Sequence, residues 1–102
     1  MTNVENLDIA DIKAGLAAGT MIVVDVREAN EFEAGHIPSA RLNPLSIFSA
    51  ADLPVHEGKR VVLSCRSGKR SLTAASMAQA AGVAIDAHYA GGRCHTKRHS
   101  AP

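Results

Sequence analysis

One cysteine near the middle of the chain carries the residues that could do chemistry. Residues 61–71 read VVLSCRSGKRS, so an apolar stretch leads to Cys65 and then into a short polar loop. Backbone N–H groups converge where a loop enters a helix, and they stabilise negative charge there. A cysteine attacks as the thiolate, which such N–H groups and nearby cations favour. The sequence therefore predicts a nucleophilic cysteine that handles a small anion.

The residues after the cysteine supply cations, hydroxyl groups and one glycine that lets the backbone turn inward. We take six of them as the candidate substrate-binding loop: Arg66, Ser67, Gly68, Lys69, Arg70 and Ser71. The alternative is a buried structural cysteine followed by a solvated basic turn, because free cysteine is often a small core residue. The density of polar and charged residues directly after Cys65 favours the functional interpretation.

The composition is typical of one globular domain. The chain has 102 residues, of which 46% are hydrophobic and 21% charged, and its formal net charge is +1. Three of the eleven cations lie in the last ten residues, so the rest is mildly acidic and offers no face for nucleic acid. No stretch approaches the roughly 18 apolar residues of a membrane span, and the first residues lack a signal-peptide pattern. We therefore expect a cytoplasmic protein with neither membrane nor nucleic-acid partners.

Apolar periodicity and turn residues divide the chain into alternating strands and helices. Helices are expected over 7–18, 28–34 and 70–81. Strands are expected over 21–26, 40–43, 60–64 and 83–89. Between them, a helical turn is expected within 44–51 and a loop over 53–59. Asp8 is the expected N-cap of the first helix, and Gly19, Gly35 and Gly82 stand where helices should end.

Strands that alternate with helices predict an α/β fold. Such units form a parallel sheet with helices on both faces, and ligands bind beyond the carboxyl ends of the strands. Asp25 and Cys65 lie at the ends of the two clearest buried strands, and Gly91 follows the last strand. We expect these three segments to meet at one rim of the sheet.

Two long motifs in this chain resemble those of one known family. Residues 25–40 read DVREANEFEAGHIPSA and closely resemble the first signature of rhodanese-like domains. Residues 65–71 resemble the active-site loop of that family, and Gly91-Gly92 resembles its late glycine pair. The resemblance covers residues 7–92. It implies a single rhodanese-like domain over residues 1–92, a three-layer sandwich around a mainly parallel five-stranded sheet.

The resemblance also implies an activity, because members of this family are sulfurtransferases. Cys65 would take sulfane sulfur from thiosulfate or a persulfide donor and become a persulfide. It would then pass the outer sulfur to cyanide, to a cellular thiol or to a sulfur-carrier protein. Carried over by position, Arg66 and Lys69 would contact the substrate and Arg70 would close the loop. Neither a metal ion nor an organic cofactor is implied.

Residues of the first motif are expected to support the rim. Asp25 and Arg27 are the candidate supporting residues, since an arginine there can pair with a nearby carboxylate and fix the loops. Glu31 lies four residues beyond Arg27, at the spacing of a helical ion pair. His36 is expected to bond backbone and fix the turn before Pro38. Direct substrate binding by Arg27 and general-base catalysis by His36 are the alternatives.

Two other functions remain open at this point. A non-catalytic sulfur-carrier or binding module would keep the fold without turnover, and a cysteine phosphatase or arsenate reductase would use the same thiolate. Phosphate-cleaving relatives place the arginine one residue later after the cysteine, which gives a wider loop. Here four residues separate Cys65 from Arg70, and Ser71 occupies the position of the phosphatase arginine. The shorter spacing favours attack on sulfur.

The last ten residues depart from the family pattern. Relatives usually continue after the glycine pair with an apolar residue, a tryptophan and a final helix, whereas residues 93–102 read RCHTKRHSAP. We expect a flexible basic tail there and a fold that lacks the terminal helix. Cys94, His95 and His99 could bind zinc weakly. Cys94 could also accept sulfur from Cys65 or form a disulfide with it.

Overall fold

A five-stranded sheet forms the middle layer of the fold. The computed structural model describes residues 4–55, 58–66 and 68–90. All neighbouring strands are parallel, in the order β1-β5-β4-β2-β3. The strands are β1 (Glu5–Leu7), β2 (Met21–Asp25), β3 (Arg41–Leu42), β4 (Arg60–Cys65) and β5 (Ala87–Ala90). The helices are α1 (Ile9–Ala18), α2 (Ala29–Ala34) and α3 (Lys69–Ala80), with 3-10 turns at Leu45–Ile47 and Ala50–Asp52.

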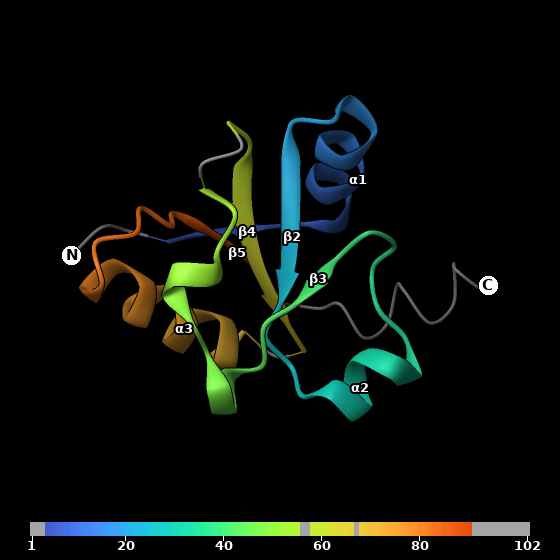
Figure 1. Cartoon of the computed structure of the whole chain (residues 1–102). Helices are drawn as coiled ribbons and strands as arrows, with labels where there is room; N and C mark the ends of the chain where they lie inside the picture. Colours follow the sequence, from blue (N-terminus) through green and yellow to red (C-terminus); the bar gives the residue numbers. More distant parts are fainter. Residues whose placement is uncertain (1–3, 56–57, 67, 91–102) are drawn as a thin grey trace.

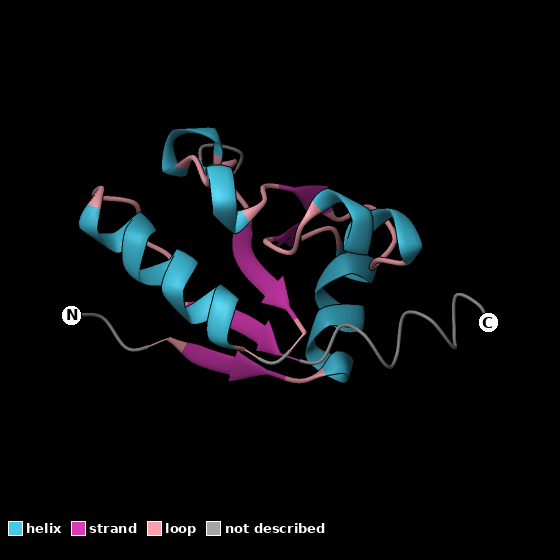
Figure 2. Ribbon diagram, turned by 90° about the horizontal axis from the view of Figure 1, so that it is seen from below, coloured by secondary structure: helices cyan, strands magenta, loops and turns pink. Residues whose placement is uncertain are grey.

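Helices cover both faces of the sheet, as the alternation of elements predicted. Side chains of β2 and β4 point alternately to the two faces, so these strands are buried on both sides. Leu63 packs with Ala74 of α3 in one core cluster, whereas Val62 packs with Ile12 of α1 in the other. Figures 1 and 2 show α3 on one side of the strands and α1 on the other. The predicted three-layer α/β architecture is thereby confirmed.

Small side chains bring α3 close to the sheet. The buried residues of this helix are Ser71, Ala74, Ala75 and Ala78. Leu72 and Met77, two large apolar residues within the predicted helix 70–81, are exposed. The helix lies almost where it was predicted, but its buried face consists of alanines and one serine. Because α3 lies so close to the sheet, its first turn comes beside the carboxyl ends of β4 and β5, where Cys65 ends β4 (Figure 1).

The beginning of the chain differs from the prediction. Leu7, expected as the first helical residue, is the last residue of β1, where it is buried and aligned with Tyr89 of β5. The helix begins at Ile9, and Asp8 caps it as predicted, since the Asp8 carboxylate accepts a 2.9 Å bond from the backbone N–H of Asp11. The strand was missed because two of its three residues, Glu5 and Asn6, are polar and exposed. Its place depends on pairing with β5.

Two other predicted strands are shorter in the structure. Only Arg41 and Leu42 of the segment 40–43 form β3, and β5 begins at Ala87 rather than at residue 83. The chain before β5 is tied to α3 instead, because the Val83 N–H donates to the Ala78 carbonyl at 2.8 Å. The late glycine pair, residues 93–102 and the predictions made for them lie outside the described residues. No helix among the described residues is long and apolar enough to cross a membrane.

Candidate active site

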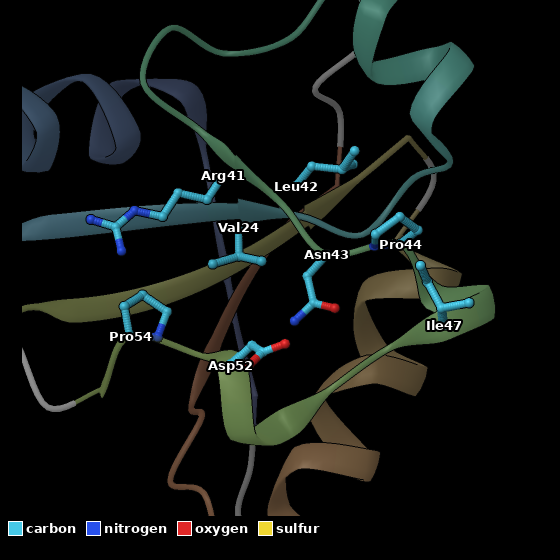
Figure 3. A pocket seen from close by; sticks show the side chains of 8 residues that line it. All are labelled: Val24, Arg41, Leu42, Asn43, Pro44, Ile47, Asp52 and Pro54. Carbon is cyan, nitrogen blue, oxygen red and sulfur yellow. The ribbon is translucent and has the colours of Figure 1, made fainter.

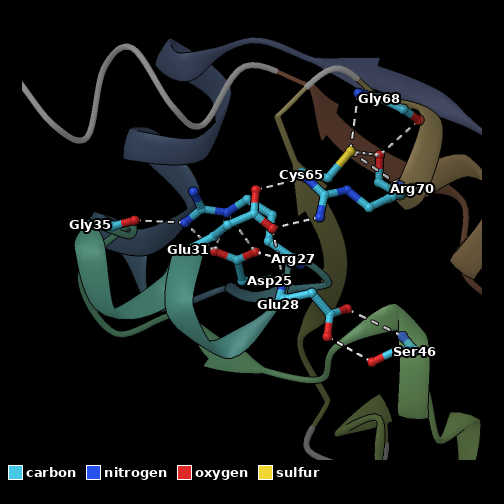
Figure 4. A network of polar contacts seen from close by, with 10 residues as sticks. Asp25, Arg27, Glu28, Glu31, Gly35, Ser46, Cys65, Gly68 and Arg70 are labelled. Carbon is cyan, nitrogen blue, oxygen red and sulfur yellow. Dashed lines mark hydrogen bonds and ion pairs between the residues drawn. The ribbon is translucent and has the colours of Figure 1, made fainter.

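Cys65 is the last residue of β4 and lies under the first turn of α3. Its side chain is 1% exposed. Sγ accepts hydrogen bonds from the backbone N–H groups of Gly68 at 3.1 Å and Ser71 at 3.2 Å. Figure 4 shows the sulfur inside the turn that leads from β4 into α3. Backbone dipoles at the N-terminus of a helix favour an anion at this place. The loop can therefore hold a sulfur that carries negative charge.

Gly68 is required by the path of this loop. It is the N-cap of α3 and has φ of 93°, a left-handed conformation that residues with a Cβ avoid. A Cβ at this position would also lie 2.9 Å from Cβ of Ala90 in β5. Glycine thus lets the loop turn while its N–H points at Sγ and its Cα lies against the end of β5.

Ser71 places a buried hydroxyl group beside the sulfur. Its Oγ lies 3.4 Å from Sγ of Cys65, 3.2 Å from the Gly68 carbonyl oxygen and 2.8 Å from Nδ1 of His88. His88 was not among the site residues predicted from the sequence. The signal that could have found it is its position near the carboxyl end of the last predicted strand, where parallel strands bring side chains to a common rim. Burial lowers the pKa of His88 below its usual value of 6.5, so the ring is held in its neutral form.

Arg70 is held at the rim by a carboxylate from α2. Its guanidinium donates to both carboxylate oxygens of Glu31, at 2.6 and 3.0 Å, across 39 positions of sequence. This bidentate bond lowers the pKa of Glu31 from 4.5 to about 2, and it raises the pKa of Arg70. The helical ion pair of Glu31 with Arg27 suggested by their spacing does not form, because Arg27 lies before α2 and its guanidinium bonds Asp25 and the Gly35 carbonyl. The charge of Arg27 still contributes to the lowered pKa of Glu31.

Asp25 and Arg27 form a buried ion pair at the end of β2. Arg27 donates from Nε and Nη2 to the carboxylate, with a shortest distance of 2.8 Å, and its backbone N–H donates to Oδ1 at 2.9 Å. The same guanidinium also donates to the carbonyl of Gly35 at 2.6 Å, which fixes the end of α2. Figure 4 shows Glu31 between Arg27 and Arg70. Two arginines therefore attach α2 to the rim.

Three predicted loop residues remain: Arg66, Lys69 and Ser67. Arg66 and Lys69 are exposed, and neither forms an ion pair with any side chain that the structure describes. Their charges are free to meet an anion that approaches the loop. Ser67 lies outside the described residues, so its predicted contact with substrate is still a prediction.

His36 serves the backbone, as expected from its place in the first motif. Nδ1 lies 2.7 Å from the carbonyl oxygen of Phe32, and the two rings are stacked with centroids 3.7 Å apart. The contact ties the segment after α2 to its last turn. The imidazole is thus engaged in local structure.

A hollow at the β3 edge is separate from the cysteine loop. It has a volume of about 200 Å³ and lies between β3 and the two 3-10 turns (Figure 3). Its lining residues are Val24, Arg41, Leu42, Asn43, Pro44, Ile47, Asp52 and Pro54. None of them belongs to the cysteine loop, so this hollow contributes nothing to the chemistry of Cys65.

Within the described part of the chain, no group of three His, Cys, Asp or Glu side chains could hold a metal ion. The zinc alternative at Cys94, His95 and His99 lies outside that part.

The comparison with known families agrees with the geometry of the loop and the order of the strands. The model of the rhodanese-like domain matches residues 8–93. This chain belongs to the rhodanese-like domain family. An uncharacterized protein of Synechocystis is 42% identical over 82 residues, and an uncharacterized protein of Bacillus subtilis is 45% identical over 53 residues. The matches cover 80% and 52% of this chain, but only 46% and 42% of those two proteins.

Three other matches span most of the matched protein's own length. The human thiosulfate:glutathione sulfurtransferase is 29% identical, and the match covers 89% of this chain and 91% of that protein. The structure of a human single-domain sulfurtransferase has a TM-score of 0.66 and 26% identity, covering 88% of this chain and 91% of that one. A Rhodopseudomonas palustris structure, described as a protein of unknown function and possible tyrosine phosphatase, has a TM-score of 0.75 and 28% identity, covering 97% and 83%.

Proposed function

We propose that this rhodanese-like domain is a sulfurtransferase that moves sulfane sulfur from thiosulfate or a persulfide to a thiol acceptor through Cys65. The observation that carries the proposal is the position of Sγ, which accepts two backbone N–H bonds at the start of α3. Those N–H groups are fixed by the fold, so they need no rearrangement when negative charge builds up on sulfur. The 29% identity to the human thiosulfate:glutathione sulfurtransferase supports the same chemistry.

The reaction consists of two displacements at sulfur. The Cys65 thiolate attacks the outer sulfur of thiosulfate, a new S–S bond forms, and sulfite leaves with the electron pair of the broken S–S bond. A thiolate or cyanide acceptor then attacks the outer sulfur of the resulting persulfide. That step breaks the bond to Sγ and returns Cys65 as the thiolate. Atoms and charge balance without any metal or redox cofactor.

The described charges suit a small dianion. The positive charge of Arg70 lies beside Sγ but is shared with Glu31, whereas Arg66 and Lys69 are exposed. We infer that these two exposed cations attract the sulfonate end of thiosulfate and the leaving sulfite. Arg70 and Glu31 fix the shape of the loop. The Ser71 hydroxyl lies 3.4 Å from Sγ, close enough to act as a further donor once the sulfur is an anion.

The spacing in the loop favours sulfur over phosphorus as the atom attacked. Both the Gly68 and Ser71 N–H groups already point to Sγ, and Arg70 is bound to Glu31. A phosphate ester needs a wider ring of donors around three equatorial oxygens. Because the similar Rhodopseudomonas palustris structure is described as a possible tyrosine phosphatase, hydrolysis of an aryl phosphate should be assayed beside sulfur transfer.

Turnover of thiosulfate with cyanide tests the proposal. The unchanged protein should form thiocyanate, Cys65→Ser should form none, and Cys94→Ser, the matched control at the second cysteine, should keep the rate. Loss of activity in both variants would contradict the assignment of Cys65 alone. Hydrolysis of p-nitrophenyl phosphate without thiocyanate would show a phosphatase. Sulfur loading of Cys65 without thiocyanate would show a carrier and overturn the proposed enzyme.

A further inference from the structure

A buried histidine lies one hydroxyl group away from the sulfur. His88 is 5% exposed and comes from β5, the strand beside β4. Its Nδ1 lies 2.8 Å from Oγ of Ser71, which in turn lies 3.4 Å from Sγ of Cys65. A buried ring nitrogen at this distance must either donate to the hydroxyl or accept from it. The nucleophilic sulfur, the hydroxyl and the imidazole thus form one continuous chain.

The hydroxyl of Ser71 has a single proton and three neighbours that could take it. These are the carbonyl oxygen of Gly68, Nδ1 of His88 and Sγ of Cys65. If Nδ1 carries a hydrogen, it donates to Oγ, and the hydroxyl proton is left for the sulfur or the carbonyl. If Nδ1 is bare, it competes with the sulfur for that proton. The state of His88 therefore decides whether an anionic sulfur keeps its third donor.

The surroundings of His88 favour a neutral ring. Burial lowers its pKa. Cys65 is the titratable group that faces it from β4, through Ser71 of α3. The Arg60, Glu5 and Asp86 charges form ion pairs at the opposite end of the strands. A neutral imidazole has one N–H, and with that hydrogen on Nδ1 the ring can donate to Ser71.

We propose that His88 is a positioning residue that directs the Ser71 hydroxyl proton to the sulfur of Cys65. The neutral ring with its hydrogen on Nδ1 donates to Oγ, and Oγ donates to the thiolate or to the persulfide formed on it. When the sulfur is a neutral thiol, the S–H donates to Oγ, and the hydroxyl proton moves to the Gly68 carbonyl. That this positioning matters for sulfur transfer rests on the proposed function. Its effect on the reactivity of the Cys65 thiol does not.

Alkylation of Cys65 across a range of pH tests the relay. The experiment uses iodoacetamide and a Cys94→Ser background, so that only one thiol reacts. His88→Leu removes the ring donor, while His88→Asn places an amide N–H where Nδ1 was. We expect the midpoint of the rate profile to rise by about half a pH unit in His88→Leu, because the Ser71 hydroxyl keeps its proton but is no longer oriented toward the sulfur. Ser71→Ala, which removes the charge-assisted hydrogen bond altogether, should raise it by about one unit. His88→Asn should stay within a few tenths of a unit of the unchanged protein.

A double-mutant cycle with Ser71→Ala separates positioning from a general structural effect. If His88 acts through the hydroxyl, His88→Leu adds no further shift once Ser71 is alanine. An equal shift in both backgrounds, or an unchanged profile in His88→Leu, would overturn the relay. Near-UV circular dichroism shows whether each variant is folded. Should His88→Leu fail to fold, His88→Gln replaces it, because its longer amide takes the place of Nε2 and should not restore the profile.

The readout is independent of sulfur transfer. A protein that forms no thiocyanate but shows the expected alkylation profiles would refute the proposed function and support the relay. A protein that turns over thiosulfate, but whose alkylation profile is unaltered in every His88 variant, would support the proposed function and refute the relay.

Discussion

Replacing Glu31 by glutamine tests how the active-site loop is attached to the rest of the fold. The carboxylate accepts both bonds from Arg70, and its pKa falls from 4.5 to about 2, chiefly because of these bonds. At 1.36 kcal/mol per pKa unit, that difference corresponds to about 3.4 kcal/mol. The side chains of Arg70 and Glu31 are 32% and 21% exposed, so solvent screening reduces the net value to about 1.5–2 kcal/mol. We expect Glu31→Gln to lose that much stability at pH 7.

The sign of the pH dependence follows from the lowered pKa. A carboxyl group whose pKa is lower in the folded state stabilises the fold fully above its unfolded value of 4.5. This stabilisation disappears as the pH falls from 4.5 toward 2. The difference in free energy of unfolding between the unchanged protein and Glu31→Gln should therefore shrink between pH 6 and pH 3. Urea unfolding followed by circular dichroism measures it.

The same helix offers a matched control. Glu33 is an exposed carboxylate of α2, and Glu33→Gln changes the net charge by the same amount. We expect its free energy of unfolding at pH 7 to stay within about 0.5 kcal/mol of the unchanged protein, as is usual for exposed positions. If Glu31→Gln and Glu33→Gln had equal stability at pH 7, the ion pair would not hold the loop, and the reasoning would be refuted.

Four further substitutions give expected changes in stability or reactivity. Gly68→Ala should cost about 1–2 kcal/mol for its left-handed backbone, with a further cost from the contact with Ala90, and should slow alkylation of the active-site thiol at pH 7. A normal alkylation rate in that variant would contradict the importance of the Gly68 N–H. Arg27→Ala should cost about 3–5 kcal/mol in urea unfolding because it leaves a buried carboxylate without its ion-pair partner, whereas the more exposed Arg60→Ala should cost less than about 1 kcal/mol. Ser39→Gly should raise stability by about 0.5–1 kcal/mol, because Ser39 has φ of 68°; a lower thermal midpoint would show that the strain is compensated.

The central layers of the fold could be predicted because their signals are local. β2 and β4 are short apolar runs buried on both faces, and α1 has a capping aspartate at one end and a glycine at the other. β1 could not be predicted in the same way, because a three-residue strand with two exposed polar side chains has no pattern of its own. Its conformation comes from hydrogen bonding with β5, whose paired residues lie 82 positions later in the chain.

In the site, too, the local features could be predicted and the contacts between distant residues could not. The types and spacing of residues around Cys65 predicted a loop that surrounds the sulfur with N–H donors, and the structure places Gly68 and Ser71 in those positions. The partners of the loop come from elsewhere in the sequence. Glu31 reaches Arg70 from α2, and His88 reaches Ser71 from β5. Local spacing indicates neither contact, because each depends on how α3 packs on the sheet.

The most direct test of the account is the intact mass of the protein after incubation with thiosulfate. We predict that the unchanged protein and Cys94→Ser gain one sulfur atom, that the added atom maps to Cys65, and that cyanide removes it as thiocyanate. Cys65→Ser should gain nothing. If the folded protein did not gain mass, or if Cys65→Ser gained a sulfur atom as well, the claim that the thiol at the start of α3 receives sulfane sulfur would be contradicted.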